Sequence, residues 1–158
     1  MGILKLAEVG DRPVLESLLN AYLTELRTLV HGDWDPAAYP WIELQWSELG
    51  RYPFIILHEG TAAGLALIRC PLSTKNGLHQ VAEFYLAPQH RGQGLAAHAA
   101  TTLFKRFPGK WELTAHEQND RAIAFWTRVI ASVTQQPMRQ RRLHSDDATR
   151  IHFLFSVN

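Results

Sequence analysis

Residues 89–94, Gln-His-Arg-Gly-Gln-Gly, are the part of the chain whose residue types and spacing best suit a chemical task. They stand between an apolar, β-prone run at 81–86 and a long segment, rich in alanine and leucine, that has a helical pattern. A helix leaves its first four N–H groups without partners and carries a partial positive charge at that end. A strand, a glycine loop and a helix in this order therefore predict a binding site for a phosphate group.

Gly92 and Gly94 suit such a loop because a residue without a Cβ adopts positive φ readily and lets a ligand approach the peptide. Arg91 adds positive charge beside them. A nucleoside-triphosphate loop is excluded, since no Lys-Ser or Lys-Thr follows Gly94. Residues 92–97 match the alanine-ended dinucleotide motif, but the strand before them is the fourth predicted. The acidic residue about 20 positions later, Glu112, lies inside another predicted strand, which disfavours a dinucleotide site.

The pattern Gln89-x-x-Gly92-x-Gly94 resembles the signature of the GNAT superfamily, the acetyl-CoA-dependent N-acetyltransferases. In that family the signature forms the pyrophosphate-binding loop between the central strand and the main helix. The order of predicted elements extends the resemblance over almost the whole chain. It implies acetyl-CoA (coenzyme A) as cosubstrate, with the pyrophosphate at residues 91–96 and the pantetheine arm in a gap beside the central strand.

A second stretch, Asn119 to Trp126, resembles the family pattern N-x-x-A-x-x-F/L-Y. It departs from that pattern in two ways, because Trp126 replaces the usual tyrosine and no Gly-Phe turn follows Ile130. The cofactor-binding residues that the two stretches imply are Leu86, Ala87, Gln89, Arg91, Gly92, Gln93, Gly94, Leu95, Ala96, Asn119 and Trp126.

The implied reaction, attack of an amine on a thioester, needs a group that accepts a proton, because a lysine-like amine has a pKa of about 10.4. Glu83 on the central strand is our first candidate for this base, and a surface carboxylate at a strand end is the alternative reading. His116 is a second candidate. Tyr85 is the candidate acid that protonates the thiolate, because the indole of Trp126 does not ionise usefully.

The acceptor is expected to be a primary amine of a small molecule, a peptide or a protein. In the family, the helices that follow the first strand wall the acceptor pocket, which makes the aromatic residues of 31–50 candidates for substrate binding. The alternative is that these rings fill the core. A second function also stays open, a non-catalytic acyl-CoA-binding sensor or interaction module. The candidate substrate-binding residues are Trp34, Tyr39, Trp41 and Trp46.

The elements that must position these residues follow from apolar periodicity and from glycine and proline positions. Strands are predicted at 3–9, 53–58, 63–70, 81–86, 111–116, 138–144 and 150–157, and helices at 14–29, from about 40 to 49, 92–107 and 121–130. The fold class is therefore α/β, with a mixed, mostly antiparallel sheet of about seven strands and about four helices. The family resemblance implies in addition one GNAT domain over 1–158 and a splayed parallel pair of strands.

Composition narrows the remaining classes of function. A net charge of +1 disfavours a nucleic-acid binder, and no apolar run is long enough to span a membrane. The eight histidines show no metal-ligand spacing, so no metal is expected. The single cysteine, Cys70, suits a buried position in a cytoplasmic protein. The chain is expected to act as a monomer or a homodimer.

Overall fold

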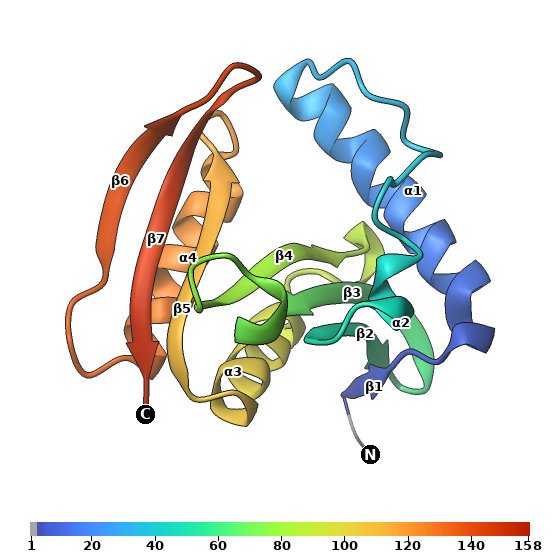
Figure 1. The fold of residues 1–158 in the computed structure, drawn as a ribbon. Helices are drawn as coiled ribbons and strands as arrows, with labels where there is room; N and C mark the ends of the chain where they lie inside the picture. The colour runs from blue at the N-terminus through green and yellow to red at the C-terminus, as the bar shows by residue number, and fades with distance from the viewer. Residues whose placement is uncertain (1–2) are drawn as a thin grey trace.

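The computed structural model describes residues 3–158, which form a seven-stranded sheet in the order β1-β2-β3-β4-β5-β7-β6 (Figure 1). This arrangement confirms the predicted fold class. Each pair of neighbouring strands is antiparallel except β4 and β5. The strands are β1 (Leu4–Leu6), β2 (Arg51–His58), β3 (Thr61–Arg69), β4 (His79–Leu86), β5 (Gly109–His116), β6 (Arg139–His144) and β7 (Thr149–Val157), and the α-helices are α1 (Arg12–Val30), α2 (Leu44–Ser47), α3 (Leu95–Arg106) and α4 (Asp120–Val133).

The parallel pair, β4 and β5, separates soon after it begins. Only His79 with Trp111 and Gln80 with Glu112 are paired between the two strands. Beyond these residues β4 and β5 run apart, as Figure 1 shows, while β5 stays paired with β7 along its whole length. The edge of β4 that faces the gap therefore keeps backbone N–H and C=O groups that no neighbouring strand uses.

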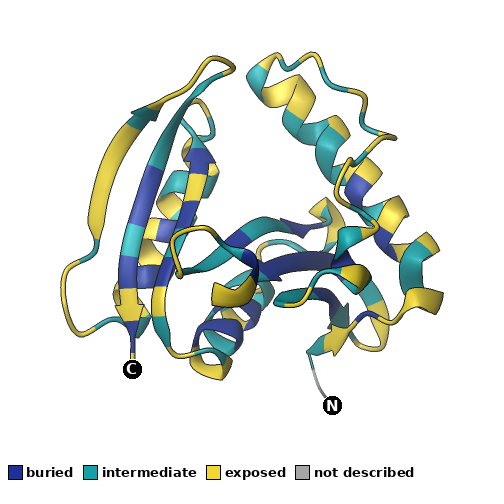
Figure 2. Cartoon of the chain, viewed as in Figure 1, coloured by how far each residue is buried: buried dark blue, intermediate teal, exposed yellow. Residues whose placement is uncertain are grey.

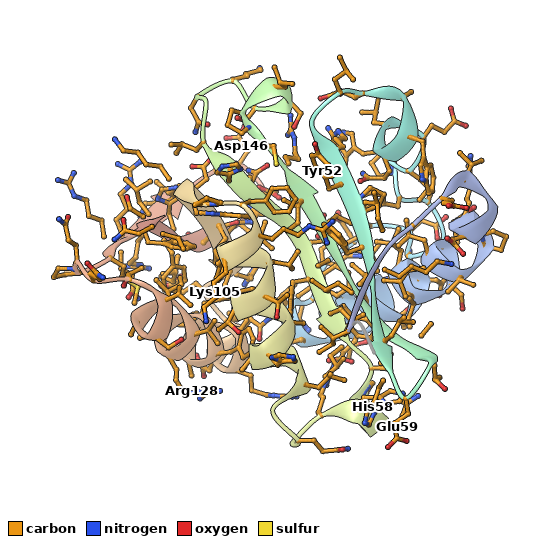
Figure 3. The ribbon with its side chains drawn as sticks, turned by 90° about the horizontal axis from the view of Figure 1, so that it is seen from below. Tyr52, His58, Glu59, Lys105, Arg128 and Asp146 are labelled. Carbon is orange, nitrogen blue, oxygen red and sulfur yellow. The ribbon has the colours of Figure 1, made fainter. Side chains whose placement is uncertain are left out.

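Helices cover the two faces of the sheet unequally. The helices α3 and α4, marked by Lys105 and Arg128 in Figure 3, pack on one face over a core that contains the fully buried Phe104, Trp111 and Phe153. Burying each such aromatic side chain contributes roughly 1.5–3 kcal/mol. The helix α1 covers the other face only over β2, β3 and β4. The β5–β7–β6 part of that face is left without a helix, and β6 is largely exposed (Figure 2).

Two predicted elements are shorter than expected. The first strand ends at Leu6 because residues Val9–Asp11 form a 3-10 helix, in which the Val9 side chain is exposed. The second helix was expected to begin near residue 40, but only Leu44–Ser47 is α-helical. The preceding residues form tight turns, with bonds from Ile42 N to Tyr39 O and from Gln45 N to Ile42 O. These bonds span three residues instead of four, so an α-helix does not form there.

Candidate active site

The glycine loop has the backbone conformation that its sequence predicts. Gly92 and Gly94 have φ values of 84° and 79°, and a Cβ added at either would meet no atom within 4 Å. Gly94 is the N-cap of α3, and the first bond of that helix runs from His98 N to Gly94 O at 3.0 Å. The N–H groups of residues 95–97 consequently have no acceptor within the helix. The two glycines of the adjacent loop have no side chain that could cover these groups.

A cleft of about 1260 Å³ opens at the end of β4, beyond the point where β4 and β5 separate. Its walls are the second half of α1, the end of β4, the glycine loop with the start of α3, and α4. The structure thus brings most of the predicted cofactor residues around one cavity. Those that line it are Leu86, Arg91, Gly92, Gly94, Leu95, Ala96, Asn119 and Trp126, joined by the predicted acid Tyr85.

Three predicted cofactor residues lie outside the lining of the cleft. The backbone N–H of Ala87 donates to Ala63 O at 2.8 Å, and its side chain packs against the core between α1 and the sheet. Gln89 and Gln93 are exposed on the loop. Their part in binding stays a prediction.

On the α4 side, Asn119 and Trp126 are fixed by local contacts. The Asn119 side chain caps α4 by accepting from Ala122 N at 3.2 Å. Trp126 is only 6% exposed, and its ring meets Phe84 edge-on at 5.1 Å. The tryptophan is therefore a rigid wall of the cleft that ties α4 to β4.

The guanidinium of Arg91 is held by two partners. Its Nε donates to the Leu86 carbonyl at 2.8 Å, and its Nη2 donates to both carboxylate oxygens of Glu25 at 2.8 and 3.0 Å. Glu25 comes from α1, so this ion pair joins two walls of the cleft. The positive charge predicted for the loop is thus paired with the carboxylate of Glu25, which sequence analysis did not identify.

Tyr85 lies where β4 faces α1. Its side chain is buried, and its ring lies 5.5 Å from that of Tyr22. Burial raises the pKa of Tyr85, and the Glu25 carboxylate adds to this rise while Arg91 opposes it. The phenol therefore stays protonated at neutral pH and is able to donate a hydrogen bond or a proton into the cleft.

Glu83 receives two hydrogen bonds from tyrosines of distant segments. Tyr22 of α1 donates to Oε1 and Tyr39 of the segment before α2 donates to Oε2, each at 3.1 Å. Burial raises the pKa of Glu83 from 4.5 to about 7, although both tyrosine hydrogen bonds lower it. A carboxylate with a pKa near the working pH suits a general base. Glu83 does not itself line the 1260 Å³ cleft, but its partner Tyr22 does.

A β-bulge decides which face Glu83 meets. Leu67 of β3 is opposite Glu83 and Ile68 is opposite Val81, so Ala82 is an extra residue on β4. Val81 packs in the core under α3, whereas Glu83 and Tyr85 face α1. In a regular strand Val81 and Glu83 would share a face, so the bulge reorients the strand between them.

The other candidate base, His116, is used locally. Its Nδ1 accepts from Gln118 N at 3.1 Å in the turn after β5, and it lies opposite Arg150 of β7. Neither the cleft lining nor the hydrogen bonds of Glu83 include it. The structure therefore does not bring His116 together with the other candidates.

Of the four candidate substrate residues, Tyr39 is the one that hydrogen-bonds to a candidate catalytic residue within 3–158, through its bond to Glu83. The Trp41 ring packs edge-on against Tyr39, with ring centroids 5.5 Å apart. Trp34 donates from its indole to Leu23 O at 3.1 Å, and Trp46 donates to Ala7 O at 3.0 Å, so both tie their segment to neighbouring elements. Trp41 is 50% exposed. The three tryptophans do not line the cleft, and their role in binding stays a prediction.

Sequence analysis missed several cleft residues that carry polar groups, among them Tyr22, Glu25, Arg121 and Arg128. Tyr22 and Glu25 are three positions apart on α1, a spacing that places both on one helix face, but the helical pattern alone marks Tyr22 as a core residue. Arg121 and Arg128 of α4 line the opposite wall and add positive charge there. Their spacing of seven residues, two helical turns, was a signal that became informative only once the helix face was known.

The described residues lack both a metal-binding cluster and a membrane-spanning helix. Residues 3–158 contain no group of three or more side chains able to hold a metal ion. No helix in that range is both long and apolar enough to cross a membrane.

The sequence of residues 15–130 matches the family model described as the acetyltransferase (GNAT) family. No curated protein matches the chain. Solved structures do match it. An acetyltransferase from Thermus thermophilus is 15% identical, with 99% of this chain and 100% of that chain covered and a TM-score of 0.71.

Two further structures show the same fold. AAC(6')-Ib in complex with ribostamycin and coenzyme A is 16% identical over 97% of this chain and 92% of that chain, with a TM-score of 0.71. An N-acetyltransferase from Staphylococcus aureus is 14% identical over 97% of this chain and all of that chain, with a TM-score of 0.70. At these identities the likeness shows the fold alone.

Proposed function

The chain belongs to the acetyltransferase (GNAT) family, and from this premise we propose that it transfers an acetyl group from acetyl-CoA to a primary amine of a small-molecule or peptide acceptor. One observation carries the proposal: the cleft borders the end of β4, where that strand no longer pairs with β5, and extends to the glycine-capped start of α3. An extended thioester arm and a diphosphate are the groups that such a cleft accommodates.

The residues of the cleft fit coenzyme A. Unshared N–H groups at the start of α3 suit the pyrophosphate, and Arg121 and Arg128 add positive charge on the α4 wall. The free edge of β4 offers backbone groups to the amides of the pantetheine arm. When bound, acetyl-CoA supplies an activated acyl group, and the protein holds and orients it beside Tyr85.

Glu83 accepts the proton of the acceptor amine, directly or through water. Converting a lysine-like ammonium to the free amine at pH 7 costs about 4.6 kcal/mol, at roughly 1.36 kcal/mol per pKa unit. Proton transfer from the amine to a carboxylate whose pKa is about 7 is less unfavourable than transfer to an ordinary glutamate. Tyr22 and Tyr39 position its two oxygens.

Tyr85 supplies the proton that the departing thiol needs. Its raised pKa keeps the phenol protonated, and it lines the cleft next to Leu86. Trp126 stands where many family members have tyrosine, and its indole N–H does not ionise usefully. Tyr85 is the tyrosine of β4 that faces the same cavity.

We place the reaction in the cytoplasm. The one cysteine, Cys70, is buried, and burial raises the pKa of its thiol to about 11. A thiol with this pKa is unreactive at neutral pH, and a single cysteine forms no internal disulfide. Both properties are typical of a protein from a reducing compartment.

The missing tyrosine at position 126 favours a second candidate function, in which the chain binds acyl-CoA without turnover. One experiment separates the two. Free thiol released from acetyl-CoA is measured across a panel of amines, and the melting temperature is measured in parallel with and without coenzyme A. We expect coenzyme A to raise the melting temperature and at least one amine to release thiol. A thermal shift without thiol release from any amine would favour the binding module. The absence of both the thermal shift and the thiol release would refute both functions.

A further inference from the structure

Two arginines lie side by side on the face of the sheet that carries Glu83. Arg51 begins β2 and Arg69 ends β3, and the two are directly opposite each other in the antiparallel ladder. Arg51 precedes Tyr52, which Figure 3 shows at the end of β2 remote from His58. Since side chains alternate along a strand, Arg69 shares a face with Leu67, which packs under α1.

One carboxylate serves both arginines. Glu48, just after α2, lies 3.5 Å from Arg51 Nε and 3.8 Å from Arg69 Nη2. Arg69 also donates to the Ser73 carbonyl, a neutral acceptor. Two guanidinium groups and one carboxylate leave one positive charge without a counter-charge in this cluster.

In this cluster the Arg51 side chain is buried, those of Arg69 and Glu48 are partly exposed, and the hydrogen bonds of the two arginines are incomplete. The Arg51 side chain is 6% exposed, and the Nε atoms of Arg51 and Arg69 have no hydrogen-bond partner among residues 3–158. Buried polar groups without partners are uncommon, because each loses its bonds to water and gains none in exchange. A guanidinium presents a planar fork of donors that matches a carboxylate, so an anionic ligand would complete these two forks.

The cluster is close to Glu83. Leu67 is opposite Glu83 on the ladder, and Arg69 lies two residues further along β3, on the order of 7 Å away. Tyr39, which donates to Glu83, connects the two positions. Burial raises the pKa of Tyr39, and the charges of Arg51 and Arg69 oppose that rise because both lie near its phenol. A small molecule that reaches the Glu83 carboxylate with one end therefore has the arginines within reach of the other.

We infer that the acceptor is a small amino-carboxylate such as an amino acid, with its amine at Glu83 and its carboxylate held by Arg51 and Arg69. This inference rests on the proposed function. It also predicts what the site rejects, because a polycationic amine would place further positive charge against the two guanidinium groups. A purely structural role for the cluster, in which Glu48 anchors α2 to the sheet through the ion pair with Arg51 Nε, requires only one arginine and leaves Arg69 Nε without a partner among residues 3–158.

The test uses matched pairs of acceptors, each pair an amino acid and the amine of the same skeleton without its carboxylate. Acetyl transfer is measured as kcat/KM for both members of each pair. Hydrogen bonds to charged groups are strong enough to give a preference of about 10- to 100-fold for the amino acid. In Arg69→Gln this preference should fall by about tenfold or more, while kcat/KM for the plain amine changes little. Equal use of the two members by the wild-type protein, or an unchanged preference in Arg69→Gln, would overturn the inference.

Arg142→Gln is the matched control. Arg142 lies on the exposed strand β6 and forms an ion pair with Glu117, which follows β5. This substitution removes the same charge and should leave the preference intact. The thermal shift that coenzyme A produces shows whether Arg69→Gln is folded, and the wild-type comparison stands even if that variant is not.

Calorimetric titration of the coenzyme A-saturated protein with the same pairs separates this inference from the proposed function. Arg69-dependent binding of the amino acid without any acetylation would refute the enzyme and retain the anion site. Acetylation of plain amines alone would refute the anion site and retain the enzyme.

Discussion

The proposed cofactor site and the proposed acceptor site, here called the cofactor side and the acceptor side, are built in different ways. The pyrophosphate end of the cofactor side is made by one short stretch, from Arg91 to Ala96, and its binding groups are backbone N–H groups set by the positive φ of Gly92 and Gly94. The acceptor side, around Glu83, is made by side chains from separate segments. Tyr22 and Glu83 are 61 positions apart, and Tyr39 and Glu83 are 44 apart. A backbone site is encoded locally, whereas a side-chain site exists only after the chain has folded.

The two sides also depend on different physical quantities. The glycine loop needs a backbone conformation, and its glycines are exposed with open space around them. The Glu83 site needs a shifted pKa, which comes from burial and is limited by two tyrosine hydrogen bonds. Substitutions should therefore separate the two sides, since loop variants should lose cofactor affinity and Glu83 variants should lose turnover.

The largest effect is expected for Glu83→Gln. Removing a general base lowers the rate by about 10²- to 10⁴-fold, so kcat should fall within that range while the affinity for acetyl-CoA stays unchanged. The wild-type kcat/KM should rise with pH through about 7, because only the ionised carboxylate accepts a proton. This limb should be absent from the pH profile of the variant. A variant with wild-type turnover would show that Glu83 is not the base.

Tyr39→Phe sharpens the same prediction. The Tyr39 hydroxyl donates to Glu83 and lowers its pKa, so its removal should move the rising limb of the profile to higher pH without abolishing turnover. A residue that only supports the fold would change the amplitude of the profile and not its midpoint.

Glu83 should also make stability depend on pH. Its pKa in the folded protein, about 7, exceeds its ordinary value of 4.5, so the folded chain holds this proton more tightly than the unfolded chain does. The resulting stabilisation is complete below about 4.5 and is lost as the pH rises through about 7. The melting temperature of the wild-type protein should fall over this range relative to that of Glu83→Gln.

A smaller effect is expected for Gly94→Ala, compared with Gly60→Ala. Gly94 has a φ of 79° and Gly60 has a φ of 80°, and neither has an atom within 4 Å of an added Cβ. Alanine at positive φ costs about 1–2 kcal/mol at either position. Both variants should therefore melt at similarly lowered temperatures, but only Gly94→Ala should weaken binding of acetyl-CoA, by about tenfold if the loop relaxes by that free energy. Equal affinity in the two variants would separate the glycine loop from cofactor binding.

The cofactor side could be predicted well from the sequence because it depends on a local backbone conformation. The same dependence means that the loop tolerates little change. Glycine, proline and apolar periodicity act over a few residues, so the order of strands and helices along the chain was predictable, although α3 begins at Leu95 and not near Gly92 as expected. The split between β4 and β5 came only from the family resemblance. Local signals failed at residues 40–43, where proline and aromatic residues form turns instead of the helix that their spacing indicated.

The acceptor side could be predicted only as a set of candidates. The aromatic segment was identified, but composition does not distinguish Tyr39, which contacts Glu83, from Trp34 and Trp46, which bond to backbone carbonyls elsewhere. The orientation of Glu83 depends on the bulge at Ala82, which the alternating pattern does not reveal. Arg51 and Arg69 stand 18 positions apart, and only strand pairing brings them together.

The smallest effect, in the opposite direction, is expected for Glu25→Gln. The Glu25 carboxylate holds Arg91 at 2.8 Å, with the two side chains 41% and 24% exposed. An incoming diphosphate would compete with this carboxylate for the guanidinium and would be repelled by it. Exposed ion pairs contribute about 0.2–1 kcal/mol, so the variant should bind coenzyme A up to about fivefold more tightly. Glu16→Gln, which breaks the Arg12 pair at 2.8 Å on the same helix, should leave the affinity unchanged. Weaker binding by Glu25→Gln would instead show that Glu25 positions Arg91 for the ligand, and the loop would then depend on a side chain from a distant segment, as the acceptor side does.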